Sequence, residues 1–207
     1  MQPDQINRLN AFLDREELFD LVKRERFARD QGRFDVMRDC FTDDAYVRTS
    51  WYDGHGGQAY VDATMKLMGR SRRGKHWVFP AFAKINGDRA TVESPAKIFG
   101  RATLHDVEVD YHVYSRFFSR AVKQNGNWKL KTFHVLWERD ELRPAVLGET
   151  VPLDKTLLAS MRPAYRYIGY IQTMRGVKVN QNLLGDDRLE ELEAFHAGED
   201  AWLAGKD

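Results

Sequence analysis

The chain has 207 residues, which suffice for one domain with a sizeable core plus an appendage but not for two full domains. Its 32 basic and 31 acidic residues nearly cancel, which excludes an overall charge that would attract nucleic acid or an anionic membrane. The single cysteine excludes an internal disulfide, and neither a signal peptide nor an apolar run of roughly 20 residues is evident, so we expect a cytoplasmic protein with a small-molecule partner.

The N-terminal part of the chain predicts two helices. Residues 14–29 are rich in helix formers, and Asp14 and Glu17 have the spacing of a capping box. A second, shorter helix is predicted over residues 33–40. Asp30 lies beside the apolar face near the last turn of the first helix, where the negative end of the helix dipole disfavours a carboxylate that has no partner. We therefore expect a proton donor close to Asp30.

The middle of the chain predicts a curled antiparallel meander. Asn86-Gly87-Asp88 and residues 124–127 are hairpin signals, and Pro80 nearly faces Pro95 across the first hairpin, which indicates a bulge or a sheet edge. Helices followed by such a meander describe an α+β cone, a curved sheet wrapped around the N-terminal helices with a cavity between. The predicted elements are a strand over 45–52, a helix over 58–69, and strands over 77–85, 89–98, 106–122 and 128–137.

His76 opens one of these strands and could meet Asp30. If the strand packs over the helix end, an imidazole meets a carboxylate inside an apolar wall, which is the minimum equipment for moving a proton. The residues alone leave an alternative open, in which Asp30 forms an ion pair with Arg26 one turn back and His76 is an ordinary strand residue. The preceding basic loop, residues 70–75, is either a solvated turn or a cationic mouth that attracts anionic or phenolic substrates.

The last part of the chain changes in character, so we expect a domain over residues 1–143 and a helical extension over residues 144–207. A helix over residues 157–175 is interrupted or begun by Pro163, and a capped helix covers residues 186–203. The extension is amphipathic and aromatic, and an apolar helical face left in water would be costly. It is therefore expected to dock on the core, as a lid over the pocket, or on a second subunit.

Five short motifs point to a known family. They are Arg15-Glu16-Glu17-Leu18, Gly32-Arg33-Phe34-Asp35, Cys40-Phe41-Thr42-Asp43-Asp44-Ala45, Asn86-Gly87-Asp88-Arg89-Ala90 and Gly126-Asn127-Trp128-Lys129-Leu130. In their order and spacing, the chain resembles the SnoaL-like branch of the nuclear transport factor 2-like superfamily over roughly residues 14–137. The superfamily contains enzymes and pure binding modules, so the resemblance implies the cone-shaped α+β fold and leaves the activity open.

Within the superfamily, the chain resembles scytalone dehydratase and hexachlorocyclohexane dehydrochlorinase, cofactor-free eliminating enzymes that use an Asp–His pair. The resemblance places Asp30 and His76 at that pair and Arg101 where the dehydratase has a second pocket histidine. Arg29 and Thr49 stand where the dehydratase has two tyrosines that polarise its carbonyl, which implies a different substrate. A family-level likeness to bacterial lyases that cleave a carbon–carbon bond in lignin-derived diaryl compounds adds release of formaldehyde to the expected reactions.

These placements predict a site in which His76, oriented by Asp30, is the general base and Arg101 stabilises a developing oxyanion. An ordinary surface role for Arg101 remains open. We expect no metal and no cofactor, because strand parity places His105 and His112 on opposite faces and no dinucleotide fingerprint is present. The residues that share the pocket-facing parity, and so form a mostly apolar substrate-binding wall, are Val47, Thr49, Trp51, Ser115, Phe117, Phe133 and Val135.

The sequence thus predicts a cofactor-independent lyase for a hydrophobic or aromatic small molecule, either a dehydratase or a retro-aldol lyase that releases formaldehyde from lignin-derived diaryl diols. The alternative is a non-catalytic ligand-binding or assembly module, like the small subunit of ring-hydroxylating dioxygenases, with side chains filling the cavity and His76 apart from Asp30. The resemblance also implies a homo-oligomer, a dimer or trimer, because convex sheet faces in this fold commonly pair.

Overall fold

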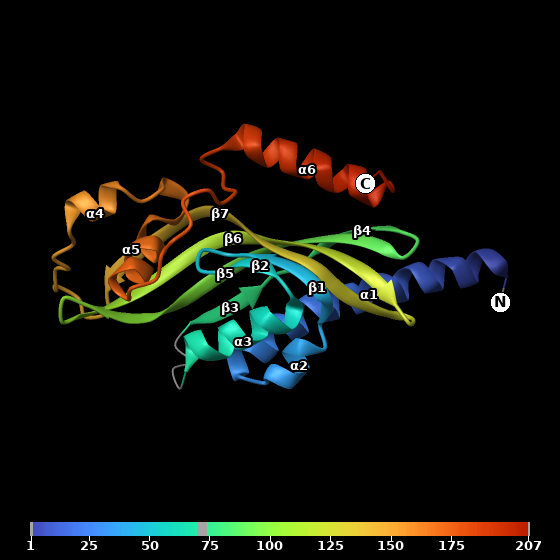
Figure 1. Cartoon of the computed structure of the whole chain (residues 1–207), viewed down its shortest axis with the longest axis horizontal. Coiled ribbons are helices and arrows are strands. Elements are labelled where there is room, and N and C mark those ends of the chain that lie inside the picture. The colour runs from blue at the N-terminus through green and yellow to red at the C-terminus, as the bar shows by residue number, and fades with distance from the viewer. Residues whose placement is uncertain (1, 70–73, 207) are drawn as a thin grey trace.

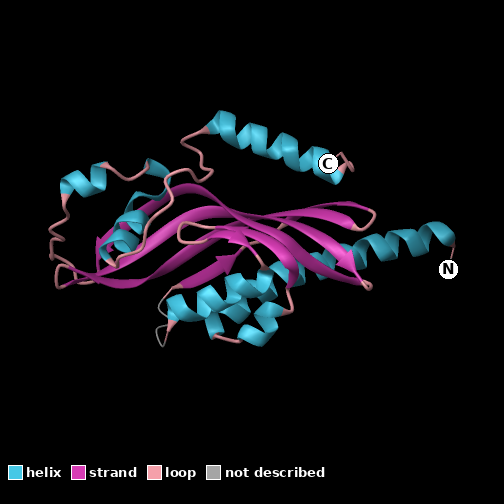
Figure 2. Ribbon diagram, viewed as in Figure 1, coloured by secondary structure: helices cyan, strands magenta, loops and turns pink. Residues whose placement is uncertain are grey.

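Seven strands form one curved, open sheet in the computed structural model, which describes residues 2–69 and 74–206. The strands are β1 (Phe41–Arg48), β2 (Asp53–His55), β3 (Lys75–Val78), β4 (Phe82–Asn86), β5 (Arg89–Leu104), β6 (Val107–Gln124) and β7 (Asn127–Pro144). Their order is β2-β1-β7-β6-β5-β3, and β4 also pairs with β5. The long strands β5, β6 and β7 run along the long axis of the molecule and carry the curvature, as Figure 2 shows.

Helices cover both faces of this sheet. They are α1 (Pro3–Gln31), α2 (Phe34–Arg38), α3 (Gly57–Met68), α4 (Lys155–Ala159), a 3₁₀ turn (Pro163–Tyr165), α5 (Arg166–Met174) and α6 (Leu189–Leu203). Helices α1, α2 and α3 lie against one face, α6 lies over the other, and α4 and α5 lie at the end of the sheet away from the N-terminus (Figure 1). The mixed α+β fold expected from the sequence is confirmed.

The core lies between the sheet and the N-terminal helices because side chains alternate along the strands. On β6, Val109, Val113 and Phe117 are buried on one face. Leu18 and Leu21 project from α1 into the same cluster, at a helical spacing that keeps both on one stripe. Every second side chain of the strands and every third or fourth side chain of the helix therefore pack together in one core.

The first helix begins well before the predicted start. Its capping box is formed by Gln2 and Gln5, whereas Asp14 lies in mid-helix, so the capping box predicted at Asp14 is wrong. The Asp14 carboxylate instead accepts hydrogen bonds from Lys123 Nζ and from Trp128 Nε1, the latter at 2.9 Å. Asp14 therefore ties the middle of α1 to the hairpin between β6 and β7.

Two features of the sheet differ from a simple antiparallel meander. Strand β1 begins at Phe41 and pairs in parallel with β7, which is possible because the rest of the sheet separates the two strands along the chain. The second feature is at Pro80, which interrupts the strand predicted over residues 77–85, so that β3 and β4 pair separately with β5. The predicted hairpin at Asn86-Gly87-Asp88 is confirmed by the pairing of β4 with β5.

The C-terminal extension docks on its own core. Leu192 and Phe195 of α6 pack with Phe118 and Leu136 on the outer sheet face. Helix α5 sends Ile171 into the main core at the end of the long strands. Within residues 2–69 and 74–206, none of the helices combines the length and the apolar character that crossing a bilayer requires.

Candidate active site

Strand β3 packs over the C-terminal end of α1 and joins His76 to Asp30. The His76 backbone N–H donates to Asp30 Oδ2 at 2.6 Å, and the ring atom His76 Nδ1 lies 2.8 Å from Asp30 Oδ1. Lys75 Nζ donates to the Asp30 carbonyl oxygen at 2.7 Å. Gly32, at a φ of 68°, ends the helix two residues after Asp30. These bonds supply the partner that a carboxylate at a helix C-terminus needs.

The electrostatic setting leaves His76 neutral at pH 7. Burial and the positive charges of Arg29 and Arg26 lower the pKa of His76 to about 4, against the opposing effect of Asp30. Burial raises the pKa of Asp30, but the hydrogen bonds from neutral His76 and the positive charge of Arg29 outweigh it, so that the net pKa lies below the usual value. An ionised carboxylate only accepts hydrogen bonds, so Nδ1 of His76 carries the proton and Nε2 carries the lone pair. The ring is therefore held in the tautomer that a general base requires.

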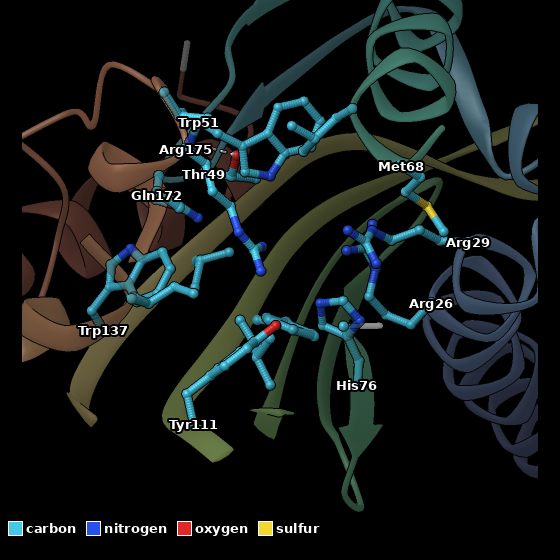
Figure 3. A pocket seen from close by; sticks show the side chains of 18 of the residues that line it. Arg26, Arg29, Thr49, Trp51, Met68, His76, Tyr111, Trp137, Gln172 and Arg175 are labelled. Atoms are coloured by element: carbon cyan, nitrogen blue, oxygen red, sulfur yellow. Dashed lines mark hydrogen bonds between the residues drawn. The ribbon is translucent and has the colours of Figure 1, made fainter. Parts of the chain in front are cut away.

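A cavity of about 540 Å³ lies on one side of this pair. Figure 3 shows His76 at its wall, with Arg26 and Arg29 of α1 beside it and Trp137, Gln172 and Arg175 at other parts of the wall. The volume suits a small organic molecule. The apolar and aromatic part of the lining consists of Trp51, Tyr60, Leu67, Met68, Ile98, Tyr111, Phe117, Val135, Trp137, Ile168 and Val177.

Four of the seven residues predicted to form the substrate wall line this cavity, namely Thr49, Trp51, Phe117 and Val135. The other three are buried in the packed interior instead. Val47 is fully buried in the core, and the Ser115 hydroxyl faces the Ala96 carbonyl oxygen across the sheet at 3.4 Å. Phe133 is covered by the guanidinium of Arg26, whose Cζ lies 4.4 Å from the ring centroid. Strand parity was right for Phe117 on β6 and Val135 on β7, but Thr49 and Trp51 lie in the turn after β1, because the strand predicted over residues 45–52 ends at Arg48. Parity also does not say which positions other side chains cover.

The prediction for Arg101 is wrong. Arg101 pairs with Asp110 on the neighbouring strand, with Nε 2.8 Å from Oδ1 and Nη2 3.1 Å from Oδ2. Half of its side chain, 52%, is exposed to solvent, and it does not line the cavity. The next residue, Ala102, is buried, so alternation along β5 turns Arg101 outward. The ordinary surface role is the correct one.

Arg26 does not form the ion pair with Asp30 that the sequence left open. Its guanidinium bonds the carboxylate of Glu25 and donates to the Tyr60 hydroxyl at 3.1 Å. Arg29 is the arginine that contacts the Asp30 carboxylate, with Nη1 3.0 Å from Oδ1. The pair is therefore flanked by two arginines of α1, and their proximity to Asp30 in the sequence is the signal that could have placed them in the site.

Sequence reasoning also missed Gln172 and Arg175, which line the cavity from the C-terminal extension. No local signal marks them, because only the packing of α5 against the end of the long strands brings them to the wall. The cationic mouth was predicted from residues 70–75, and residues 70–73 of it lie outside the described residues. Lys75, the last residue of that loop, contacts Asp30.

The other candidate groups have separate roles. Burial raises the pKa of the Cys40 thiol to about 11, and its Sγ faces the Val36 carbonyl oxygen at 3.2 Å, so it is a poor nucleophile. His105 Nε2 lies 2.9 Å from the Tyr170 hydroxyl, whereas His112 Nδ1 lies 2.9 Å from a Glu141 carboxylate oxygen. Across the described part of the chain, no three side chains of the metal-ligating types are grouped to hold an ion.

Comparison with known proteins supplies a family and a fold. A family model described as "SnoaL-like domain" matches residues 10–134. Pea pathogenicity protein 2 of Fusarium vanettenii is 26% identical over 203 residues, which are 94% of this chain and 87% of that protein.

Two solved structures have a similar fold at low sequence identity. One, provisionally assigned as a scytalone dehydratase of Novosphingobium aromaticivorans, has a TM-score of 0.53 and 16% identity, over 70% of this chain and 96% of that chain. The other, a hexachlorocyclohexane dehydrochlorinase of Novosphingobium barchaimii, has a TM-score of 0.56 and 16% identity, over 70% of this chain and 99% of that chain.

Proposed function

This chain belongs to the SnoaL-like domain family, and from that premise we propose that it is a cofactor-independent lyase for a hydrophobic, aromatic small molecule. The family's fold serves catalytic and non-catalytic proteins alike, so the site has to support the proposal. One observation carries it: Asp30 holds Nδ1 of His76 at 2.8 Å, at the wall of a cavity of about 540 Å³. The assembly-module alternative predicts a filled cavity and separated side chains, and the geometry has neither feature.

The proposed reaction begins with proton transfer to His76. Neutral Nε2 takes a proton from a substrate carbon or hydroxyl, and the carboxylate of Asp30 stabilises the imidazolium that forms. Tyr111 is the proposed donor to the oxygen that becomes negative, in place of Arg101, because its ring lines the same cavity. The Tyr111 hydroxyl also lies close to Gly74, which is two residues before His76: a Cβ added to Gly74 would be 3.2 Å from this hydroxyl.

Two outcomes follow from the same first step. In a dehydration, the proton leaves a carbon, the electron pair forms a double bond, and the hydroxyl on the neighbouring carbon leaves as water with the proton returned by His76. In a retro-aldol cleavage, the proton leaves a hydroxyl, the carbonyl of formaldehyde forms, and the electron pair of the broken carbon–carbon bond passes to the remaining fragment, which is then protonated. His76 gives and takes the proton in both.

The test is an incubation of the purified protein with a panel of aromatic alcohols and diols, followed by mass spectrometry for loss of water or formaldehyde. On any substrate that reacts, His76→Ala should lower turnover by about 100-fold or more while the circular dichroism spectrum is unchanged. The matched control is His112→Ala, which removes a histidine from the surface pair with Glu141 and should keep full turnover. Full activity of His76→Ala would remove this pair from the mechanism.

A further inference from the structure

The cavity wall carries one positive charge that the described residues do not neutralise. Three arginines line the cavity, and none of its described lining residues is an aspartate or glutamate. Arg26 is paired with Glu25, and Arg29 with Asp30. Within residues 2–69 and 74–206, the guanidinium of Arg175 has neither a hydrogen-bond nor an ion-pair partner. Its charge is therefore available to a ligand.

Arg175 is exposed to solvent and lines the cavity, so its charge lies at the open part of the cavity, where a ligand can reach it. Arg175 follows α5 directly, and its side chain extends from there into the cavity toward Tyr111 (Figure 3). Burial raises the pKa of Tyr111, while the positive charges of Arg175 and Arg29 oppose that effect. The Tyr111 hydroxyl is therefore close enough to interact with two positive charges, that of Arg175 and that of Arg29, which contacts the Asp30–His76 pair. A ligand in the cavity can therefore contact Arg175 and the wall beside His76, because both residues line it.

Gln172 adds a second polar group at the same place. It precedes Arg175 by three residues, so both side chains leave the same side of the helix end. Gln172 Nε2 donates to the Ser50 hydroxyl at 2.8 Å, whereas Oε1 is buried with no partner among the described residues. Either orientation of the amide leaves one of its two polar atoms unpaired, and buried polar atoms in proteins are nearly always satisfied. A polar group of a ligand would supply the hydrogen bond that this amide atom lacks.

We infer that the substrate is an aromatic carboxylic acid, with its carboxylate bound by Arg175 beside Gln172 and its ring against the apolar wall in front of His76. The inference rests on the proposed function of this cavity and names the substrate class. A planar guanidinium matches both oxygens of a carboxylate, and a carboxylate is the group that offsets an uncompensated cation. Arg175 is then the residue that determines specificity, and the C-terminal extension supplies it.

Binding of matched probes tests the inference. The probes are 2-naphthoate and naphthalene-2-carboxamide, which have similar shape but differ in charge, and their affinities follow from quenching of tryptophan fluorescence, since Trp51 and Trp137 line the cavity. The wild-type chain should bind the acid about tenfold more tightly than the amide, a difference of about 1.4 kcal/mol. Arg175→Met should abolish this preference and leave the affinity for the amide within about twofold. Arg101→Met, which removes an exposed arginine outside the cavity, should change neither affinity.

Equal affinities of the wild-type chain for the two probes, or no measurable binding of the acid, would overturn the inference. So would an acid preference that survives in Arg175→Met, because Arg26 or Arg29 would then hold the carboxylate. The same titration with His76→Ala separates this inference from the proposed function, since that variant lacks the base and should retain the preference. Acid selectivity without turnover of any substrate would overturn the lyase alone, and turnover restricted to neutral substrates would overturn the carboxylate site alone.

Discussion

Replacing Arg29 with glutamine should raise the pKa of His76, because the charge of Arg29 is second only to burial among the causes that lower it to about 4. Arg29 Nη1 and His76 Nδ1 contact the same oxygen of Asp30, at 3.0 and 2.8 Å, so they lie at most about 6 Å apart. With an effective dielectric constant of about 20, two unit charges at that distance interact by about 3 kcal/mol, which corresponds to about 2 pKa units. The guanidinium charge is spread over three nitrogens, so we expect an increase of about 1 to 2 units, to a pKa between about 5 and 6.

The assay is a titration of the histidine ring protons by nuclear magnetic resonance, with the His76 signal assigned by its loss in His76→Gln. Arg101→Gln is the matched control, because it removes the same charge from a solvent-exposed pair and should leave the His76 titration unchanged. A wild-type pKa near the ordinary value of about 6.5, or the same pKa in Arg29→Gln as in the wild type, would refute the electrostatic reasoning.

Three further predictions concern stability and are all measured by urea unfolding. Glu25→Gln should destabilise the fold by about 3 to 5 kcal/mol because it leaves the buried Arg26 without its counter-ion, and a loss below about 1 kcal/mol would contradict that role. Gly57→Ala should cost about 1 to 3 kcal/mol of stability because the new Cβ would lie 2.5 Å from the Thr42 carbonyl oxygen. Gly198→Ala should stabilise α6 by up to about 1 kcal/mol, because apart from adjacent residues and the helix's own backbone no described atom lies within 4 Å of the new Cβ. Equal effects of the two substitutions would be inconsistent with these contacts. The pKa of His76 in the folded state, about 4, lies below the unfolded value of about 6.5. The contribution of His76 to stability is therefore complete above about pH 6.5 and is lost as the pH falls toward about 4. His76→Gln should flatten the pH dependence of the free energy of unfolding between these values, and an unchanged slope would contradict this role of His76.

The sequence was informative where a local rule implies a long-range partner. Asp30 at the end of a helix is unfavourable alone, and His76 opens a strand that can cover it, so their contact could be inferred before any coordinates. Alternation along the strands also placed Phe117 and Val135 at the cavity. These inferences succeeded because each rests on periodicity or on an electrostatic cost that the neighbouring residues determine.

Other parts of the site depend on information that local patterns lack. Arg101 shows how sensitive a strand position is, since a shift of one residue moves a side chain to the opposite face of the sheet. Arg175 is followed by Gly176 at an ordinary helix end, and only the docking of α5 on the sheet brings it to the cavity. Asp14 had the spacing of a helix cap but bonds a distant hairpin through Lys123. Tertiary packing decides such positions.

The central claim is that His76 and Asp30 act as one unit in proton transfer, and a double-variant comparison of turnover tests it most directly. On a substrate that the wild-type chain converts, Asp30→Asn and His76→Ala should each lower kcat by about 100-fold or more, and the double variant should be no slower than His76→Ala alone. An Asp30→Asn variant with wild-type kcat, or losses that multiply in the double variant, would contradict the account.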